Sequence, residues 1–272
     1  MNAVCDIKKH CEDSQKIYLN KSIYSVTGSD IVYNNNLCGK MYVISDVTDS
    51  YNYTVRLQRD VSEKTREIVK IQHSVIASFA NMIEARDGVT GLHIKRTSAY
   101  VEIIVKELQK SSDYKGILTD EYASKIIDVA PLHDIGKISI PDDILKKPGK
   151  LTDEEFDVIK THPGMGAEII EETLIEVEWN EYLCIARDMA HYHHEKWNGT
   201  GYPCGLEGDE IPLCARIMAI ADVYDALRSK RSYKEGFSKE KSRNIILESS
   251  GSHFDPKIVD AFMANIQEIE RV

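Results

Sequence analysis

The chain has 272 residues, of which 42% are hydrophobic and 29% are charged, as in a globular protein with one ordinary domain and a small appendage. The net charge of −10 disfavours binding to DNA or RNA, and no apolar run approaches the roughly 18 residues that span a bilayer. The six cysteines form no C-x-x-C pair, which favours reduced thiols in a cytoplasmic protein over zinc fingers.

The N-terminal part is predicted to be a small antiparallel β segment, which we place at residues 1–53. Short alternating segments occur here, and turn residues such as Gly28 separate them; the segments are 17–19, 22–26, 30–33 and 40–47. Residues 39–49 resemble the closing strand of a PAS sensor domain. A complete PAS domain is about twice as long, so a β cap or dimerisation element is the alternative.

A long helix is predicted next, because apolar residues recur every three or four positions at Leu57, Val61, Ile68, Ile71, Val75 and Met82. Residues 54–76 of this helix form the predicted linker. The apolar seam favours pairing with a second copy, which would give a homodimer. The alternative is that the helix packs against its own domain.

Residues 77–272 are predicted to form an all-helical bundle, so the fold class is mainly α. Amphipathic stretches lie near 92–110, 119–133, 153–160, 164–176, 180–194, 213–229, 238–249 and 256–270. Thr119 and Thr152 are predicted N-caps. One long loop rich in glycine and proline, at 197–213, interrupts the helices.

Five of the nine histidines occur in settings that suit metal binding: His93, His133, His162, His193 and His194. Asp134 follows His133 directly, and Lys137 lies on the next turn, so the three can face one cavity. An imidazole nitrogen beside a carboxylate that can bridge is what two close divalent ions require. Gly136 lacks a side chain where a substrate or a helix could approach closely.

Asp222 is a further candidate, because it lies in a helix that is apolar on almost every side. A buried carboxylate is costly unless a cation or metal compensates it. A salt bridge from Asp222 to Arg216 or Arg228 is the alternative explanation.

These motifs, in this order, resemble the HD-GYP domain over the chain from about residue 74 to the C-terminus. The matching blocks are Thr90-Gly91-x-His93-x-x-Arg96, His133-Asp134-Ile135-Gly136-Lys137, His162-Pro163-x-x-Gly166-Ala167-Glu168, His193-His194-Glu195-x-x-x-Gly199-x-Gly201-Tyr202-Pro203, Ala221-Asp222-Val223-Tyr224-Asp225-Ala226-Leu227 and His253-Phe254-Asp255-Pro256. The resemblance implies a bacterial phosphodiesterase that opens cyclic di-GMP to linear pGpG, often continuing to GMP, at an iron or manganese centre.

Carried over by position, the resemblance implies the metal ligands His93, His133, Asp134, His162, His193, His194 and Asp222. It also implies that Asp134 bridges two ions, which could hold a hydroxide that attacks phosphorus, with His133, Asp134 and Lys137 as catalytic residues. Val89 stands where members with a third ion carry Glu. We therefore expect two divalent ions, iron or manganese.

Substrate contacts are expected from Lys137, Gly201, Tyr202 and Pro203, and the resemblance implies that Arg231 and Lys234 bind the substrate phosphates. Tyr202 could stack on a guanine, although anchoring of its loop is the alternative. Arg96 and Asp225 are expected to support the ligand residues, and for Asp225 a surface salt bridge is the alternative.

The sequence therefore predicts a metal-dependent cyclic di-GMP phosphodiesterase. One alternative is a phosphodiesterase for another cyclic dinucleotide, such as 3',3'-cGAMP, because guanine and adenine are distinguished by pocket edges that no motif reveals. The other is a non-catalytic receptor or adaptor that binds the nucleotide or a diguanylate cyclase. The complete ligand set argues against that second alternative.

Overall fold

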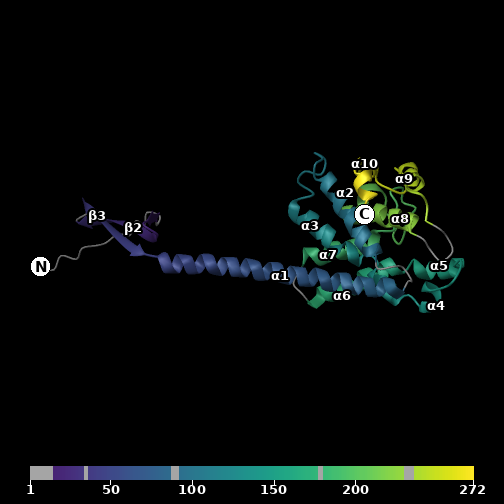
Figure 1. The fold of residues 1–272 in the computed structure, drawn as a ribbon, viewed down its shortest axis with the longest axis horizontal. Helices are drawn as coiled ribbons and strands as arrows, with labels where there is room; N and C mark the ends of the chain where they lie inside the picture. The colour runs from purple at the N-terminus through teal and green to yellow at the C-terminus, as the bar shows by residue number, and fades with distance from the viewer. Residues whose placement is uncertain (1–14, 34–35, 87–91, 177–179, 230–235) are drawn as a thin grey trace. The chain divides into compact units, whose positions relative to one another are not determined.

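A computed structural model describes residues 15–33, 36–86, 92–176, 180–229 and 236–272 (Figure 1). The chain forms two compact units, Met1–Ile71 and Gln72–Val272. The predicted mainly α fold with a small antiparallel sheet is confirmed. The predicted domain boundaries after residues 53 and 76 remain predictions.

The first unit contains a three-stranded antiparallel sheet in the order β1-β2-β3, with bounds Gln15–Leu19, Ser22–Tyr33 and Asn36–Asp46. Asn20 and Lys21 form a two-residue turn in which both φ angles are positive, at 45° and 71°, as tight hairpins require. The predicted break at Gly28 is wrong. This glycine stays within β2 and pairs with Tyr42 of β3, because its backbone groups can join the ladder although it has no side chain.

The long helix α1 runs from Thr48 to Arg86. At its start, the Thr48 hydroxyl accepts a hydrogen bond from the Ile23 N–H at 2.8 Å, which ties the helix to the sheet. The side chains of the predicted apolar seam, from Leu57 to Met82, are 46–61% exposed. The last turns differ, because Ala80, Ile83 and Glu84 are buried.

The second unit is a helical bundle. Its α-helices are α2 His93–Leu108, α3 Asp120–Val129, α4 Asp142–Leu145, α5 Asp153–Ile159, α6 His162–Glu176, α7 Glu181–Tyr192, α8 Leu213–Arg228, α9 Lys239–Glu248, α10 Pro256–Ala264 and α11 Ile266–Ile269. Short 3-10 turns lie at Ala130–Leu132, Ile135–Ser139 and Gly208–Glu210. The predicted caps are confirmed, since Thr119 accepts from the Tyr122 N–H and Thr152 forms a capping box with Glu155.

Two predicted helices end earlier than expected. The helix predicted at 119–133 stops at Val129, because Pro131 has no N–H to continue the hydrogen-bond ladder. His133 and Asp134 therefore lie in the turn between two 3-10 segments rather than in a regular helix. The helix predicted at 256–270 is likewise interrupted at Asn265.

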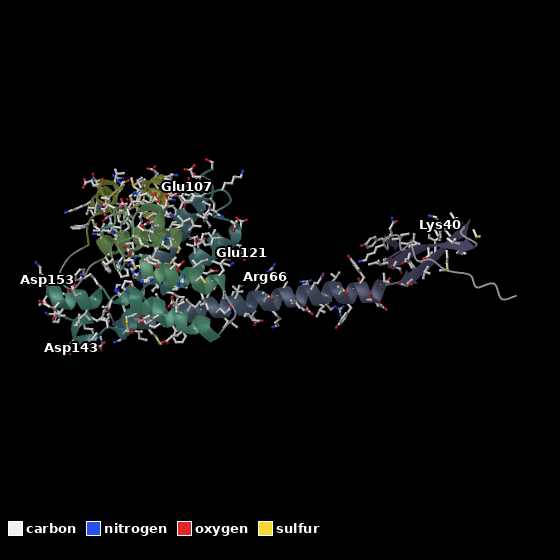
Figure 2. The ribbon with its side chains drawn as sticks, turned by 180° about the vertical axis from the view of Figure 1, so that it is seen from behind. Lys40, Arg66, Glu107, Glu121, Asp143 and Asp153 are labelled. Atoms are coloured by element: carbon white, nitrogen blue, oxygen red, sulfur yellow. The ribbon has the colours of Figure 1, made fainter. Side chains whose placement is uncertain are left out.

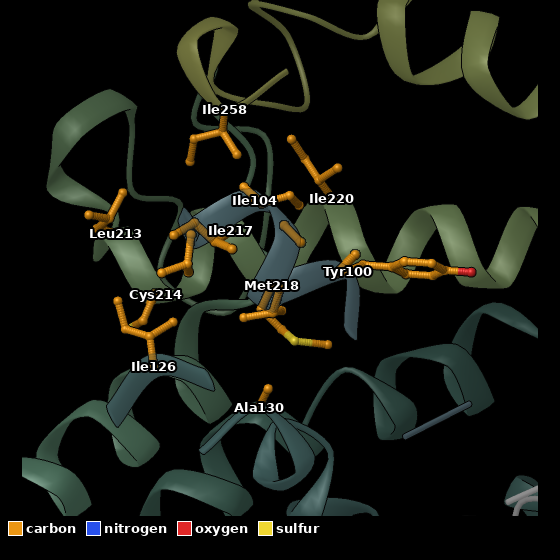
Figure 3. Close-up of a cluster of buried hydrophobic side chains, with 14 of the residues drawn as sticks. Tyr100, Ile104, Ile126, Ala130, Leu213, Cys214, Ile217, Met218, Ile220 and Ile258 are labelled. Atoms are coloured by element: carbon orange, nitrogen blue, oxygen red, sulfur yellow. The ribbon is translucent and has the colours of Figure 1, made fainter. Parts of the chain in front are cut away.

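Helix α8 lies at the centre of the bundle and packs against α2, α7, α9 and α10. Its apolar side chains point to several sides, and Ile217, Met218 and Ile220 are fully buried among residues of α2, α3 and α10 (Figure 3). Acidic side chains such as Glu121 and Asp153 are exposed on the same unit, in keeping with the negative net charge (Figure 2). This buried apolar core holds the elements that carry the polar residues of the candidate site.

Candidate metal centre

The predicted ligand residues come from five different places in the bundle. His93 is the first residue of α2, His162 is the first of α6, and Asp222 lies within α8. The pair of His133 and Asp134 follows α3, while His193 and His194 follow directly after α7. These positions lie far apart in the sequence, so the packing of the helices brings the side chains together.

Two groups of residues in the described part of the chain have donor atoms within 4.8 Å of one another. One group is Asp134, His162, His193 and His194, and the other is His93, His133 and Asp134. Asp134 belongs to both groups. A carboxylate has two oxygens, so this position could serve two neighbouring cations.

Three buried histidines point the same ring nitrogen towards this centre. Their Nδ1 atoms hydrogen-bond to backbone carbonyls, which can only accept, so each Nδ1 carries a proton. His133 bonds to Ala130 at 2.8 Å, and His162 and His193 do the same with the carbonyls three residues before them. Each Nε2 is buried without a hydrogen-bond partner among the residues described. Unpaired buried nitrogens are costly, and a metal ion that accepts their lone pairs removes the cost.

The oxygens of Asp134 face different histidines. Its Oδ1 lies 3.2 Å from Nε2 of His162 and 3.6 Å from Nε2 of His193. Its Oδ2 lies 3.3 Å from Nε2 of His133 and 2.8 Å from Nζ of Lys137. The carboxylate is thus shared between two sides of the centre, with one ammonium group beside it.

On the other side, His93 is held by a buried carboxylate. Its Nδ1 lies 2.7 Å from Oδ2 of Asp225, which is fully buried and also ion-paired with Arg96 through two hydrogen bonds of 2.5 and 2.8 Å. The alternative of a surface salt bridge for Asp225 is therefore wrong. Nε2 of His93 faces Oδ1 of Asp222 at 3.7 Å. Arg216 instead pairs with Asp209 and Asp255, so the alternative of an Arg216 partner for Asp222 is not what the structure shows.

Burial and charge set the proton affinities of the centre. Burial alone would lower the pKa of His133, but the adjacent Asp134 carboxylate raises it to about 9. Burial would raise the pKa of Asp134, yet Lys137 and His133 hold it well below its usual range. Burial lowers the pKa of His193 and His194. Two imidazoles are therefore neutral at pH 7, in the form that binds metals.

Close backbone packing positions His162. Gly136, in the turn after Asp134, lies against the start of α6. A Cβ added at Gly136 would be 1.9 Å from the His162 carbonyl oxygen and 2.5 Å from the Gly166 nitrogen. Of the two uses predicted for this glycine, the structure shows the close approach of a helix.

A family model described as HD domain matches residues 78–258, which is more than half of the chain and contains all seven predicted ligand residues. The chain belongs to the HD domain family.

Curated relatives of this HD domain chain carry two kinds of names. A protein named cyclic di-GMP phosphodiesterase from Vibrio cholerae is 43% identical over 90% of this chain and 49% of its own length. One of the same name from Thermotoga maritima is 35% identical over 82% of this chain and 59% of its own length. A Vibrio cholerae protein named 3'3'-cGAMP-specific phosphodiesterase 2 is 38% identical over 79% of this chain and 37% of its own length.

These relatives confirm the predicted resemblance to HD-GYP proteins. The chain spans about half the length of the first Vibrio relative. None of the helices in the described ranges combines the length and apolarity that crossing a membrane requires.

The Gly-Tyr-Pro loop of the HD domain lies next to the metal centre. The ring of Tyr202 stacks on His194, with centroids 4.8 Å apart, so one face of the ring is already occupied. This contact favours the anchoring role for Tyr202. A Cβ added at Gly201 would be 2.3 Å from the Lys196 nitrogen, so only glycine fits there, while Pro203 is exposed.

Three residues of the sequence prediction lie outside the described residues: Val89, Arg231 and Lys234. Their expected roles remain predictions. Arg96 contacts Asp225, and Asp225 in turn contacts His93.

The sequence reasoning missed two buried carboxylates. Glu195 accepts hydrogen bonds from the N–H groups of Cys204, Gly205 and Leu206 at 2.6, 3.0 and 3.2 Å, and so fixes the end of the Gly-Tyr-Pro loop. Glu84, near the end of α1, is 2% exposed and faces His93. Glu195 directly follows two candidate ligands, which was an available signal, whereas Glu84 looks like an ordinary residue of an amphipathic helix.

Proposed function

We propose that this chain is a metal-dependent phosphodiesterase that hydrolyses cyclic di-GMP to linear pGpG. The observation that carries the proposal is the pair of buried ligand groups that share Asp134. The names of the relatives support the choice of a cyclic dinucleotide as substrate.

We propose two cations, iron or manganese, held by His93, His133, Asp134, His162, His193, His194 and Asp222. Imidazoles and carboxylates without thiolates suit these metals. When bound, such ions supply Lewis-acid charge for an attack on phosphorus. The Nδ1–carbonyl hydrogen bonds of the histidines keep Nε2 aimed at the ions, and Asp225 does the same for His93.

Lys137 has two roles in this proposal. Its ammonium group, 2.8 Å from Asp134, offsets part of the carboxylate charge in the buried centre. It also offers a positive charge to a phosphate oxygen as charge develops there. We assign further substrate contacts to Gly201, Tyr202 and Pro203 in the loop, and to Arg231 and Lys234, whose charges would attract an anionic substrate to an acidic protein.

We also propose that the chain forms a homodimer through α1. The exposed seam of Leu57, Val61, Ile68, Ile71 and Val75 supports this, because apolar side chains at heptad spacing are stabilised when a second helix covers them. A diguanylate cyclase remains a candidate partner. The free cysteines Cys38, Cys184, Cys204 and Cys214 fit the predicted cytoplasmic location.

The decisive experiment is an anaerobic assay of protein reconstituted with Fe(II) or Mn(II), offered cyclic di-GMP, 3',3'-cGAMP and pGpG separately. We expect faster hydrolysis of cyclic di-GMP than of 3',3'-cGAMP. The reverse order would favour the second substrate, to which one relative's name points. Binding without turnover by fully loaded protein would favour a receptor.

Asp134→Ala tests the shared ligand. We expect this variant to lose stable loading of both ions and hydrolysis, because both ligand groups lose a member. Asp128→Asn is the matched control, since Asp128 is a partly buried carboxylate that faces His73 instead of the centre. Wild-type activity in Asp134→Ala would refute the bridging assignment.

A further inference from the structure

Glu84 is a buried carboxylate that the proposed ligand set does not use. It lies two residues before Arg86, the last residue of α1, and its side chain is 3% exposed. Its Oε1 is 3.3 Å from Nε2 of His93. Its Oε2 is buried and has no hydrogen-bond partner within the described part of the chain. Such a group is costly to bury unless a positive charge compensates it.

The hydrogen bonds of His93 leave two states for this contact: a protonated ring that donates to Glu84, or a neutral ring that shares a cation with it. The Nδ1–H of this ring is directed at Asp225, whose second oxygen is already paired with Arg96. In the neutral ring, Nε2 therefore presents a lone pair to Glu84 at 3.3 Å and to Asp222 at 3.7 Å. A lone pair and two carboxylates facing each other in a buried space repel, unless a cation lies among them.

The charge of the surroundings points the same way. Around His93 and His133 lie the four carboxylates of Glu84, Asp134, Asp222 and Asp225, which carry four negative charges. Two cationic side chains oppose them, since Lys137 pairs with Asp134 and Arg96 pairs with Asp225. Imidazoles that bind a metal are neutral, so in that state the cluster has an excess of two negative charges, which one divalent cation balances. In the metal-free protein a proton on His133, whose pKa is raised to about 9, offsets one of these charges.

The distances also suit shared coordination. Two ligand atoms that are each about 2.1 Å from one ion, at right angles to each other, are about 3 Å apart. The 3.3 Å between Glu84 Oε1 and His93 Nε2 is close to that separation. A modest rotation of the carboxylate would bring either oxygen to the ion.

We propose that Glu84 is an additional metal ligand, which helix α1 supplies to the cation on the His93 side of the centre. This assignment rests on the proposed metal-dependent function. The sequence lacks a carboxylate at Val89, and Glu84 provides one from a different position. The ion on this side then has His93, His133, Asp134, Asp222 and Glu84 around it, an oxygen-rich set that suits iron or manganese.

A purely structural role for Glu84 makes a different prediction. If the carboxylate only accepts a hydrogen bond from a protonated His93, the glutamine variant keeps a carbonyl oxygen in the same place and changes metal binding little. If Glu84 is a ligand, the glutamine variant loses the anionic donor that the ion needs. Glu84→Gln therefore separates the two roles without changing the shape of the side chain.

The test is a titration of the metal-free full chain with Mn(II) under anaerobic conditions, followed by calorimetry and by the electron paramagnetic resonance signal of bound Mn(II). Wild type, Glu84→Gln and the control Asp128→Asn are compared. We expect two ions per wild-type chain and a loss of affinity of about 10- to 100-fold for one of them in Glu84→Gln. The control should bind like wild type, and all three metal-free proteins should melt at similar temperatures.

Three results would count against the assignment. If Glu84→Gln binds both ions with the same affinities as wild type, the assignment is wrong and the proposed function is unaffected. Absence of metal binding by the wild type would overturn the proposed function together with it. If Glu84→Gln and Asp128→Asn both bind the two ions more weakly than wild type, and to the same extent, the cause is a general loss of folding, and the assignment is also overturned.

Discussion

Gly136→Ala should disrupt the metal centre although the substitution adds only one methyl group. The new Cβ would be 1.9 Å from the His162 carbonyl oxygen, and Cβ atoms in proteins essentially never come closer than 3.0 Å to such an atom. The turn after Asp134 and the start of α6 must therefore separate by at least about 1 Å. Both contacted groups are backbone, so no side-chain rotation can relieve the overlap.

The expected cost follows from this displacement. Overpacking a protein interior costs about 1–3 kcal/mol, and an overlap with backbone atoms should cost an amount at the upper end of that range. For a unit of this size, about 3 kcal/mol corresponds to a decrease in Tm of roughly 6–12 °C. His162 moves with the start of α6, and a shift of about 1 Å in a positioned group can reduce turnover by on the order of 100-fold.

The assay combines thermal unfolding of the metal-free protein, metal content after reconstitution and hydrolysis of cyclic di-GMP. Gly164→Ala is the matched control, because it adds the same methyl group in the first turn of the same helix, where nothing lies within 4 Å. We expect this control to be at least as stable as wild type. If Gly136→Ala matches Gly164→Ala in Tm and metal content, the packing argument for His162 is wrong.

Two further predictions concern the surroundings of the centre. Glu195→Gln should destabilise the folded Gly-Tyr-Pro loop by about 1–3 kcal/mol, because an anionic acceptor of three N–H groups becomes a neutral amide. We expect a raised KM with unchanged metal content. An unchanged KM would contradict the anchoring role of Glu195. Burial and the nearby Lys196 lower the pKa of His253 to about 4. Between pH 4 and 6.5 the unfolded chain, with a histidine pKa near 6.5, binds more protons at His253 than the folded chain does. The contribution of neutral His253 to the free energy of unfolding should therefore be fully present above pH 6.5. It should be lost as the pH falls towards 4, by at most about 3 kcal/mol. The free energy of unfolding, measured by chemical denaturation across this pH range, should change less steeply with pH in His253→Gln than in wild type. Equal pH dependence in the two proteins would refute the lowered pKa of His253.

Much of the candidate centre could be predicted from the sequence, because each predicted metal ligand lies in a short motif with its neighbours. His133 with Asp134, and His193 with His194, are adjacent in the chain, so their proximity needs no tertiary information. The helices were predictable from apolar periodicity, and Thr119 and Thr152 from their capping patterns. Gly28 was misread because turn-forming residues also occur inside strands when the ladder continues on both sides.

The sequence by itself determined the types of ligand, the mainly helical fold and membership of a metal-binding family, since these depend on residue identity and local spacing. Only the tertiary structure decided which atoms face each other. Backbone carbonyls at the helix ends fix the proton on Nδ1 of three histidines and so direct Nε2 inward. Packing of the end of α1 against the bundle buries Glu84 beside His93. Helical periodicity cannot reveal such a contact, because it says which side of a helix is buried and not which residue from another helix lies opposite.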